Sequence, residues 1–304
     1  MTEDYLENAL TPLYKPGKEP MRLAIMMSGS GTNAKKIIER YLADRERGDV
    51  TFRPVVIFTD NPDSKAERIA KQDYKASGLE IAVVTNSIRE FYTNLGMAIN
   101  DMHVREQYDT QQANLFQDEG IDAIAMAGYD WVISPVLCDY FTMVNVHPGD
   151  LRVVGENGKR KYFGLGWVPS AKAILEGKNE VYTSVHLVIP LLDGGPLLGV
   201  SAPQPVPQQV APLMNRSVLL GEGMNSLGDV MKYVREHPDM KDKDLFKMFP
   251  IYEFAKDCQD RLKEKGDWIV FPQVISDISR GNYQQDGSGK IYFEHKPVPN
   301  GVQF

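Results

Sequence analysis

The sequence predicts an α/β fold: a doubly wound, mostly parallel sheet with helices on both faces. Short apolar runs alternate with longer amphipathic stretches through the first half of the chain, which is the pattern of successive strand–helix–strand units. A glycine-rich turn directly follows the first apolar run, and polar side chains follow later runs. Ligands in such sheets bind at the carboxyl ends of the strands, so we expect a site there.

Each predicted element has a local reason. The strands are short apolar or alternating runs, and the helices carry apolar residues at helical spacing. Ser87 is expected to cap the long stretch that ends at Phe116, and Pro135 to begin a short helix. Asp286-Gly-Ser-Gly predicts a hairpin near the end. The predicted strands are 22–27, 54–59, 81–84, 121–126, 143–146, 182–189 and 197–202, and the predicted helices are 34–47, 64–75, 87–116, 135–141, 170–175 and 258–280, the last interrupted near Pro272.

Composition divides the chain into four segments. Residues 1–20 form a polar N-terminal arm, 21–205 the core, 206–256 an insertion packed on the core, and 257–304 a C-terminal helix and hairpin that complete the same domain. Pro203, Pro205 and Pro207 make a stiff connector that leads into the insertion. Its methionines are expected to pack inside and not to form a binding surface. These methionines are Met214, Met224 and Met231.

Charge and cysteine content exclude several classes of protein. The 304 residues carry a net charge of −7 and no long basic run, which argues against nucleic acid or an anionic membrane as the main partner. Cys138 and Cys258 lie far apart, the histidines show no zinc-type spacing, and no metal is expected. No signal peptide or membrane-length apolar run is visible. The sequence therefore predicts a cytoplasmic protein.

The glycine-rich turn at residues 28–33 is a candidate anion site. A strand, a turn with two glycines and a helix expose backbone N–H groups and the positive end of the helix to a ligand. Gly31 allows close approach, and Thr32 and Asn33 add side-chain donors. Two alternatives stay open: a dinucleotide site, because Gly29, Gly31 and Ala34 fit the G-x-G-x-x-[G/A] spacing, and a tight turn without a ligand.

A second candidate site lies at Asn145 and His147. Alternation along a strand points both side chains to one face, just before the Pro148-Gly149 turn. An amide and an imidazole side by side suit a carbonyl oxygen that must carry negative charge. Asp193 precedes paired glycines that could hold its carboxylate in a tight turn. The alternative is a strand end with a satisfied histidine.

Together these motifs resemble the folate-dependent formyltransferases. The likeness rests on Ser-Gly-x-Gly-x-Asn at 28–33, Ala-Gly-Tyr at 127–129, Asn-Val-His-Pro at 145–148, Ser-Val-His at 184–186 and Leu-Asp-Gly-Gly-Pro at 192–196. It covers about residues 22–205 and resumes near Cys258. The resemblance is greatest to the members that formylate glycinamide ribonucleotide. It implies transfer of a formyl group from 10-formyltetrahydrofolate, the co-substrate, to a primary amine that is phosphorylated.

The resemblance also implies roles for individual residues. Asn145, His147 and Asp193 match the catalytic trio, and Gly31, Thr32 and Asn33 match the turn that holds the substrate phosphate. Asp267 matches, more weakly, a Glu that holds the substrate ribose. The residues matched to the folate are Arg89 near its tail, and Asp130, Trp131, Val132, Ile133, Asn145, Ile189, Pro190, Leu191, Leu192 and Asp193 around its pterin. On this reading Asn145 N–H and a protonated His147 donate to the oxyanion, while Asp193 favours the imidazolium.

Departures from the family pattern leave the acceptor open. Extra residues follow the catalytic strand at 152–160, Phe163 replaces an expected Pro, and Trp131 stands where an Arg is common. The 152–160 and 207–256 segments either shape the amine pocket or cover apolar surface. Another amine such as an amino sugar nucleotide, hydrolysis of the folate, or a non-catalytic binding module stay as alternatives. The oligomeric state is also open, with a homodimer as one alternative. His186 can have either a structural or a functional role.

Overall fold

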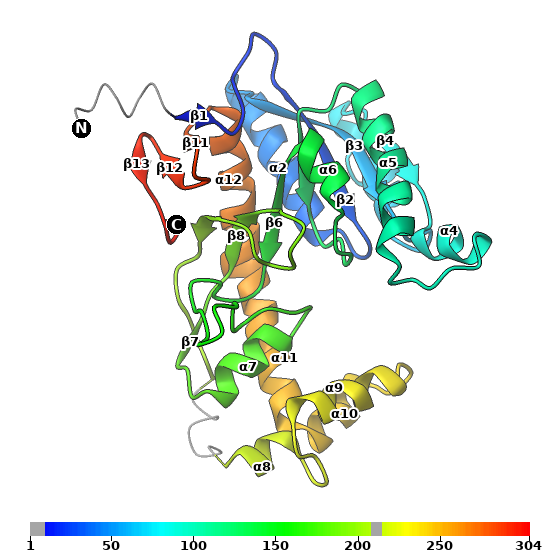
Figure 1. Cartoon of the computed structure of the whole chain (residues 1–304), viewed down its shortest axis with the longest axis vertical. Coiled ribbons are helices and arrows are strands. Elements are labelled where there is room, and N and C mark those ends of the chain that lie inside the picture. The colour runs from blue at the N-terminus through cyan, green and yellow to red at the C-terminus, as the bar shows by residue number, and fades with distance from the viewer. Residues whose placement is uncertain (1–9, 208–214) are drawn as a thin grey trace.

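A mixed eight-stranded sheet forms the centre of the protein (Figure 1). The computed structural model describes residues 10–207 and 215–304. The strand order is β14-β9-β8-β6-β5-β2-β3-β4. The pairs from β6 to β4 and the pair β14/β9 are parallel, whereas β8 runs antiparallel to both of its neighbours. The predicted doubly wound, mostly parallel sheet is confirmed.

The strands form where the sequence has apolar or alternating runs. β2 is buried on both faces, as expected for a central strand covered by helices on each side. Two short antiparallel sheets accompany the large one, β1-β11-β12-β13 and β10-β7. The strands are β1 Thr11–Pro12, β2 Met21–Met27, β3 Phe52–Thr59, β4 Ala82–Thr85, β5 Ala123–Met126, β6 Thr142–His147, β7 Glu180–Val181, β8 Ser184–Leu187, β9 Leu197–Val200, β10 Gln204–Pro205, β11 Tyr283–Gln285, β12 Ile291–Phe293, β13 Lys296–Pro297 and β14 Val302–Gln303.

Helices cover both faces of the sheet and extend below it. Each face carries its own apolar cluster, one including Ile37 of α2 and Val274 of α12, the other Tyr108 of α5 and Leu137 of α6. The helices are α2 Thr32–Arg47, α3 Ala66–Arg68, α4 Ile88–Asn94, α5 Met102–Asp118, α6 Pro135–Tyr140, α7 Val168–Leu175, α8 Arg216–Leu220, α9 Leu227–Glu236, α10 Asp242–Met248, α11 Pro250–Leu262 and α12 Trp268–Ser279, with π-helical turns at Ile69–Asp73 and Lys263–Asp267 and a 3₁₀ turn at Lys75–Ser77.

The two longest predicted helices have different limits in the structure. Ser87 caps α4 as expected, but the stretch to Phe116 is broken after Asn94, and Asp101 caps a separate α5 by accepting from the backbone N–H of His103. The helix expected to begin at 258 begins at Pro250, and Pro272 lies inside α12 without ending it. The segment boundary expected at residue 256 therefore falls within α11.

The insertion packs on a third apolar cluster, away from the sheet. This cluster joins α7 to α8–α11, with Ile174, Leu219, Phe249 and Cys258 buried in it. Figure 1 shows these helices as a lobe connected to the sheet by the long α11–α12 helix. Met224 packs against the cluster, Met231 is 40% exposed, and Met214 lies outside the described residues.

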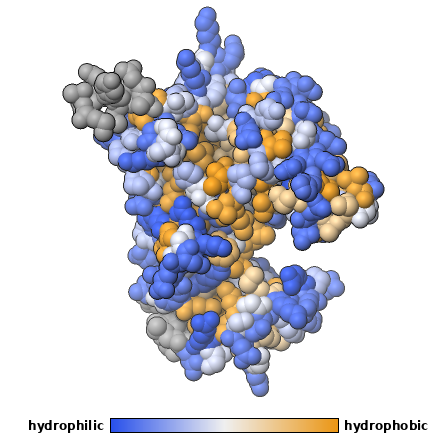
Figure 2. Space-filling model, in the orientation of Figure 1, coloured by the Kyte–Doolittle hydropathy of each residue, from blue (hydrophilic) through white to orange (hydrophobic). Residues whose placement is uncertain are grey.

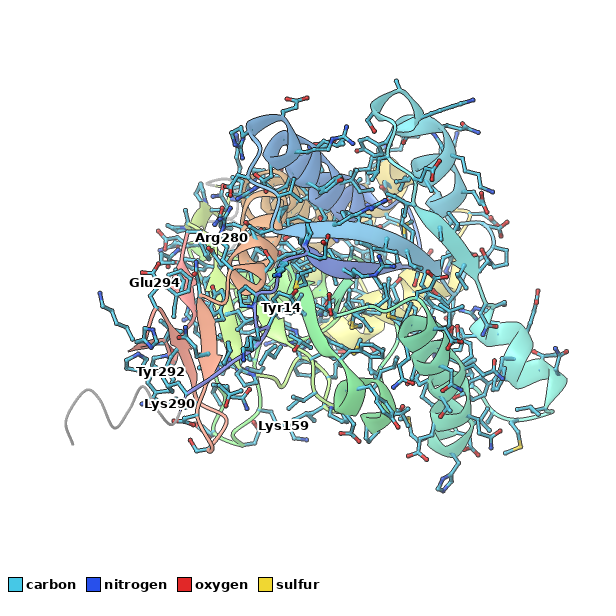
Figure 3. All side chains as sticks on the ribbon, turned by 90° about the horizontal axis from the view of Figure 1, so that it is seen from above. Tyr14, Lys159, Arg280, Lys290, Tyr292 and Glu294 are labelled. Atoms are coloured by element: carbon cyan, nitrogen blue, oxygen red, sulfur yellow. The ribbon has the colours of Figure 1, made fainter. Side chains whose placement is uncertain are left out.

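The small sheet at the opposite end ties the N-terminal segment to the C-terminal hairpin. β1 pairs with β11, and β11 with β12, as the Asp-Gly-Ser-Gly turn predicts. Figure 3 shows Lys290, Tyr292 and Glu294 of this hairpin on the same side of the molecule as Tyr14. The described part of the predicted polar arm, from residue 10, is thus held by the hairpin; residues 1–9 lie outside the described range.

Candidate active site

The glycine-rich turn leaves the first N–H groups of α2 without a side-chain cap. Gly31 is the N-cap residue, with φ 68°, and the first turn of α2 contains no acidic residue. A Cβ at Gly31 would meet Ile69 and lie 2.8 Å from Cε of Met27. Only glycine therefore fits both the backbone and the space. The N-terminus of this 16-residue helix can receive an anion through its free N–H groups.

Antiparallel pairing of β6 with β8 brings the predicted polar residues together. Asn145 stands opposite His186, and His147 opposite Ser184. His147 and His186 are each 3% exposed. The alternation predicted for both strands thus places one amide and two imidazoles on one side of the sheet edge, at the end of β6.

Asp193 lies between the two histidines. Its Oδ2 is 3.5 Å from Nδ1 of His147, and its Oδ1 is 3.8 Å from Nε2 of His186. The Gly164 backbone N–H donates to Oδ2 over 3.3 Å. Asp193 has φ 50°, in the left-handed region where Asp and Asn are the best tolerated residues after glycine. The turn thus holds the carboxylate within 4 Å of one nitrogen of each imidazole.

The hydrogen bonds of His186 define its tautomer. Its Nδ1 lies 2.7 Å from the Leu187 carbonyl oxygen, which can only accept, so Nδ1 carries the hydrogen. Burial lowers the pKa of His186 to about 4, which leaves the ring neutral and Nε2 an acceptor. Nδ2 of Asn145 donates to it over 3.3 Å. His186, left open by the sequence, therefore fixes which end of the Asn145 amide faces it, and the second N–H of Asn145 stays free.

His147 differs from the expectation of a protonated ring. Its Nε2–H donates to the Tyr162 carbonyl oxygen over 2.7 Å, so Nδ1 is the nitrogen that faces Asp193. Burial is the largest influence on its pKa and lowers it, outweighing the raising effect of Asp193. The ring is therefore neutral in the free protein. Burial destabilises the imidazolium more than the Asp193 carboxylate, 3.5 Å away, stabilises it.

Asp267 is a buried carboxylate at the far side of the same cleft. It accepts from Thr183 Oγ1 over 2.7 Å and from Asn33 Nδ2 over 3.4 Å. Burial raises its pKa to about 6. Oδ1 of Asn33 is buried without a hydrogen-bond partner among the described residues. The two side chains thus link the glycine-rich turn to the end of the α11–α12 helix.

A single cleft of about 690 Å³ joins these parts. Figure 2 shows apolar surface gathered in the hollow between the sheet and the helical lobe. The predicted residues that line the cleft are Gly31, Thr32, Asn33, Asp130, Trp131, Val132, Asn145, His147, Leu192, Asp193 and Asp267. Ile133 is 2% exposed in the core, while Ile189 and Leu191 are 37% and 62% exposed. Those three, with Pro190 and Arg89, are not among the lining residues.

The Trp131 indole is held by one hydrogen bond and by two neighbouring guanidinium groups. Its Nε1–H donates to Asp60 over 2.6 Å, and the Asp60 carboxylate also accepts from Ser28 in the glycine-rich turn. The guanidinium groups of Arg89 and Arg105 lie 5.6 and 5.2 Å from the centre of the indole ring. The tryptophan that departs from the family pattern is therefore fixed by cation–π contacts with Arg89 and Arg105.

Comparison with known proteins decides the family. Residues 21–223 match the family model described as formyl transferase. This chain belongs to the formyl transferase family. It is 27% identical over 180 residues to the phosphoribosylglycinamide formyltransferase of Escherichia coli (strain K12), covering 59% of this chain and 70% of that one. The enzyme of the same name from Haemophilus influenzae is also 27% identical, over 179 residues.

The solved structures agree on the fold. The phosphoribosylglycinamide formyltransferase from Coxiella burnetii superposes with a TM-score of 0.58 at 18% identity, covering 94% of this chain and 100% of that one. The sequence resemblance is thus confirmed, and the chain is a formyltransferase enzyme. The family match continues past residue 205, the expected end of the core.

The insertions of this formyltransferase do not line the cleft. Among described residues, neither 152–160 nor 215–256 is part of its lining. Val153 instead packs against the third apolar cluster, with α8–α11. Arg152 pairs with Asp150 and lies over the ring of Tyr182, at 4.3 Å. Arg160 of the same loop reaches the other way and donates to the Gly195 carbonyl oxygen over 3.3 Å. Val153 thus covers apolar surface, and a role of the two segments in the amine pocket stays a prediction.

Several residues of the formyltransferase site were missed from the sequence, and three of them illustrate why. Gln259 and Lys263 line the cleft together with Asp267. Their spacing of four residues, which places side chains on one helix face, was a signal that could have revealed them. The Tyr162 carbonyl had no such signal, because backbone contacts across 15 residues are not written in the side chains.

Two further properties concern the described residues. Within residues 10–207 and 215–304, no three His, Cys, Asp or Glu side chains come together in a group that could hold a metal ion. None of the helices in the same ranges combines the length and hydropathy required to cross a membrane.

Proposed function

We propose that this formyltransferase transfers the formyl group of 10-formyltetrahydrofolate to the amine of glycinamide ribonucleotide, a step of purine biosynthesis. The observation that carries the proposal is that an anion-type turn and the Asn145–His147–Asp193 group line one cleft. The first suits a phosphorylated substrate and the second an acyl transfer. The relatives in Escherichia coli and Haemophilus influenzae carry the corresponding name.

Asn145 is proposed to stabilise the oxygen of the tetrahedral intermediate. Attack of the amine on the formyl carbon moves negative charge to this oxygen. The Asn145 amide is oriented by the neutral Nε2 of His186, 3.3 Å away, and its second N–H is available to the oxygen. One well-placed donor of this kind contributes on the order of 3 kcal/mol to the transition state.

His147 and Asp193 are proposed to move the proton. As the new C–N bond forms, the attacking amine must lose a proton, and the folate nitrogen must gain one as the old C–N bond breaks. A neutral imidazole can accept the first, and the Asp193 carboxylate 3.5 Å away stabilises the imidazolium that results. The same proton can then pass to the leaving nitrogen, so the reaction consumes and releases none.

The substrates are proposed to enter from opposite sides of the catalytic group. Gly31, Thr32 and Asn33 would bind the phosphate of the amine, and Asp267 its ribose. Trp131 and the turns at 130–133 and 189–193 would hold the pterin, with Arg89 near the folate tail. The hydrogen bond between Asn33 and Asp267 supports the assignment of these two residues to the same substrate.

A panel of acceptors tests the proposal. The enzyme is given 10-formyltetrahydrofolate with glycinamide ribonucleotide, glycinamide, an amino sugar nucleotide or no amine, and both deformylated folate and formylated amine are measured. We expect product with glycinamide ribonucleotide, and a KM for glycinamide higher by orders of magnitude because it lacks the phosphate. Preference for the amino sugar nucleotide, or folate deformylation without an amine, would replace the proposal by one of those activities.

A further inference from the structure

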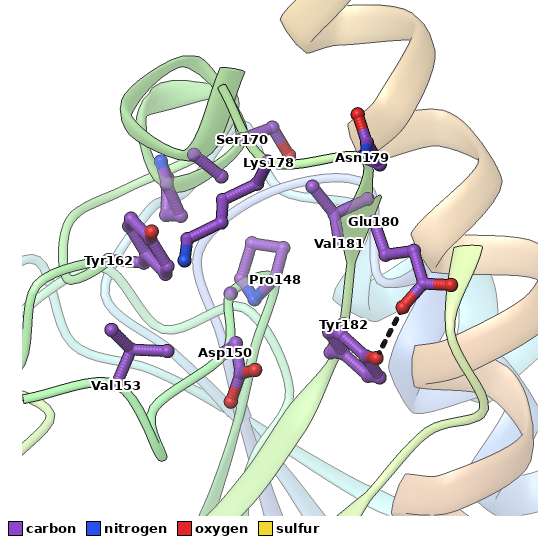
Figure 4. A pocket seen from close by; sticks show the side chains of 13 residues that line it. Pro148, Asp150, Val153, Tyr162, Ser170, Lys178, Asn179, Glu180, Val181 and Tyr182 are labelled. Atoms are coloured by element: carbon purple, nitrogen blue, oxygen red, sulfur yellow. Dashed lines mark hydrogen bonds between the residues drawn. The ribbon is translucent and has the colours of Figure 1, made fainter. Parts of the chain in front are cut away.

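A second cavity lies behind the catalytic strand end, separate from the cleft. Its volume is about 370 Å³, within the range of sites for small ligands. Its floor is the Pro148–Gly149–Asp150 turn that directly follows His147, and its walls come from Tyr162, α7 and the strand leading to Tyr182. Figure 4 shows these side chains surrounding the opening. Of its lining, only Pro148 also lines the catalytic cleft.

One part of the wall is apolar. Ala173 of α7 and Val181 of β7 are each 3% exposed, and Tyr162 is 2% exposed. Val153 of the chain's extra loop and Pro169 complete this surface. The walls therefore suit the flat or branched hydrocarbon part of a small molecule, from which they would exclude water.

Two polar groups in the cavity have no partner among the described residues. Ser170 is 1% exposed, lines the cavity, and its Oγ is buried without a hydrogen bond. Such a group costs stability, and this oxygen lies within the wall and not at the surface of the cavity. Lys178 extends over the opening (Figure 4), and no hydrogen bond or ion pair of its ammonium is found in the described structure. Ser170 also lies in the first turn of the eight-residue α7, where the helix dipole is positive.

The carboxylates beside the cavity are already engaged. Both oxygens of Asp150 accept from the guanidinium of Arg152, at 2.8 and 2.9 Å. Glu180 accepts from the Tyr182 hydroxyl over 2.7 Å, and Figure 4 shows this bond at the outer edge. The groups that remain for a ligand are thus the Lys178 ammonium and the N-terminal end of α7, both of which favour negative charge.

We propose that this cavity is a second binding site, which takes a small organic anion: an apolar body between Tyr162 and Val181, with its carboxylate or phosphate on Lys178. The site is connected to catalysis, because the carbonyl of Tyr162 holds Nε2 of His147. A Cβ at Gly149 would lie 2.7 Å from that same nitrogen, so the floor packs directly against the catalytic ring. A ligand that shifts Tyr162 therefore changes the orientation of His147.

Binding can be measured without any substrate, so it stands independently of the proposed function. The full chain is titrated by calorimetry with benzoate, phenyl phosphate and, as the opposite charge on a similar body, benzylamine. We expect benzoate or phenyl phosphate to bind in the low millimolar range or tighter and benzylamine not to bind. Whichever anion binds tighter identifies the head group as a carboxylate or a phosphate monoester.

Two substitutions assign the binding to this cavity. Lys178→Met removes the charge and keeps the length, and should weaken the anion by about tenfold or more. Lys159→Met is the matched control, an exposed lysine of the neighbouring loop that does not line the cavity. Ala173→Leu should fill the cavity and abolish binding. The Lys178 comparison decides the matter if the Ala173 variant does not fold.

Three results would overturn the assignment: no binding of either anion, equal binding of benzylamine, or anion binding unchanged in both Lys178→Met and Ala173→Leu. The last would mean that the anion occupies another site, such as the glycine-rich turn. For the connection to His147, we expect the bound anion to change kcat at least about twofold in wild type and not in Lys178→Met. If the anion binds but kcat and KM do not change, the binding site is confirmed and its proposed effect on His147 is wrong.

Discussion

Replacement of Asp193 by Asn separates the charge of this residue from its shape. Asn is tolerated in the left-handed backbone conformation that Asp193 adopts, and its oxygen can still accept from Gly164. What disappears is a negative charge 3.5 Å from Nδ1 of His147. At an effective dielectric constant of about 20, Coulomb's law gives about 5 kcal/mol for an imidazolium–carboxylate pair at this distance.

That energy is an upper limit for the effect on catalysis, since the transition state shares its charge with other groups. We expect kcat to fall by roughly 10²- to 10³-fold, corresponding to about 3–4 kcal/mol, with little change in the KM for folate. The assay is the initial rate of folate deformylation with saturating amine. The reasoning would be refuted by a folded Asp193→Asn variant, checked by thermal unfolding, whose kcat stays within about threefold of wild type.

Three further predictions concern the rest of the site. Gly31→Val should raise the KM for the phosphorylated amine far more than that for folate, whereas Gly48→Ala, which has the same backbone conformation but open space at the other end of α2, should not. Asp267→Asn should gain stability over wild type as pH rises from about 4 to above 6, by roughly 3 kcal/mol in urea unfolding, because the raised pKa makes the buried carboxylate costly once ionised; a pH-independent difference would contradict this. His186→Phe keeps the ring but loses the acceptor for Asn145, so kcat should fall about tenfold with KM unchanged; the exposed His103→Phe is its control.

Local patterns were sufficient for the fold and for much of the site. The central strand β2 reads as a buried strand because all but one of its residues are apolar, and the alternation of Asn145 and His147 follows from strand geometry. The break between α4 and α5 was missed although Gly96, with φ 64°, and the cap Asp101 both signal it. The low pKa of His147 could not be predicted, since it depends on burial by distant segments.

Contacts between distant segments also determine where the insertions lie. Residues 152–160 directly follow the strand that carries Asn145 and His147, but the side on which a loop folds depends on the surfaces that its side chains can contact. Val153 packs with the cluster under α7, whereas Arg160 reaches the Gly195 carbonyl oxygen. A sequence shows the length of a loop, but it does not show on which surface the loop packs.

The π-helical turn at 263–267 is a place where the number of residues in the chain is critical. This turn holds one residue more than an α-helical turn, so it sets the rotation between α11 and α12. Deleting a single residue there would turn all later side chains of the helix by about 100°. Val270 and Val274, which pack close to Gly199 of β9, would leave the sheet, and Asp267 would leave the cleft.

Gly266 within the turn lies against Thr183, so no larger residue fits to absorb such a shift. The lobe that precedes Pro250 has no comparable constraint from the sheet, since its helices pack on their own cluster. A scan of one-residue deletions should therefore be tolerated in the connections between α8 and α10 and fail sharply at 263–267. Fusions or linkers meant to leave the enzyme active belong in the former region, because there the chain can change its length without changing the phase of the helix that carries Asp267.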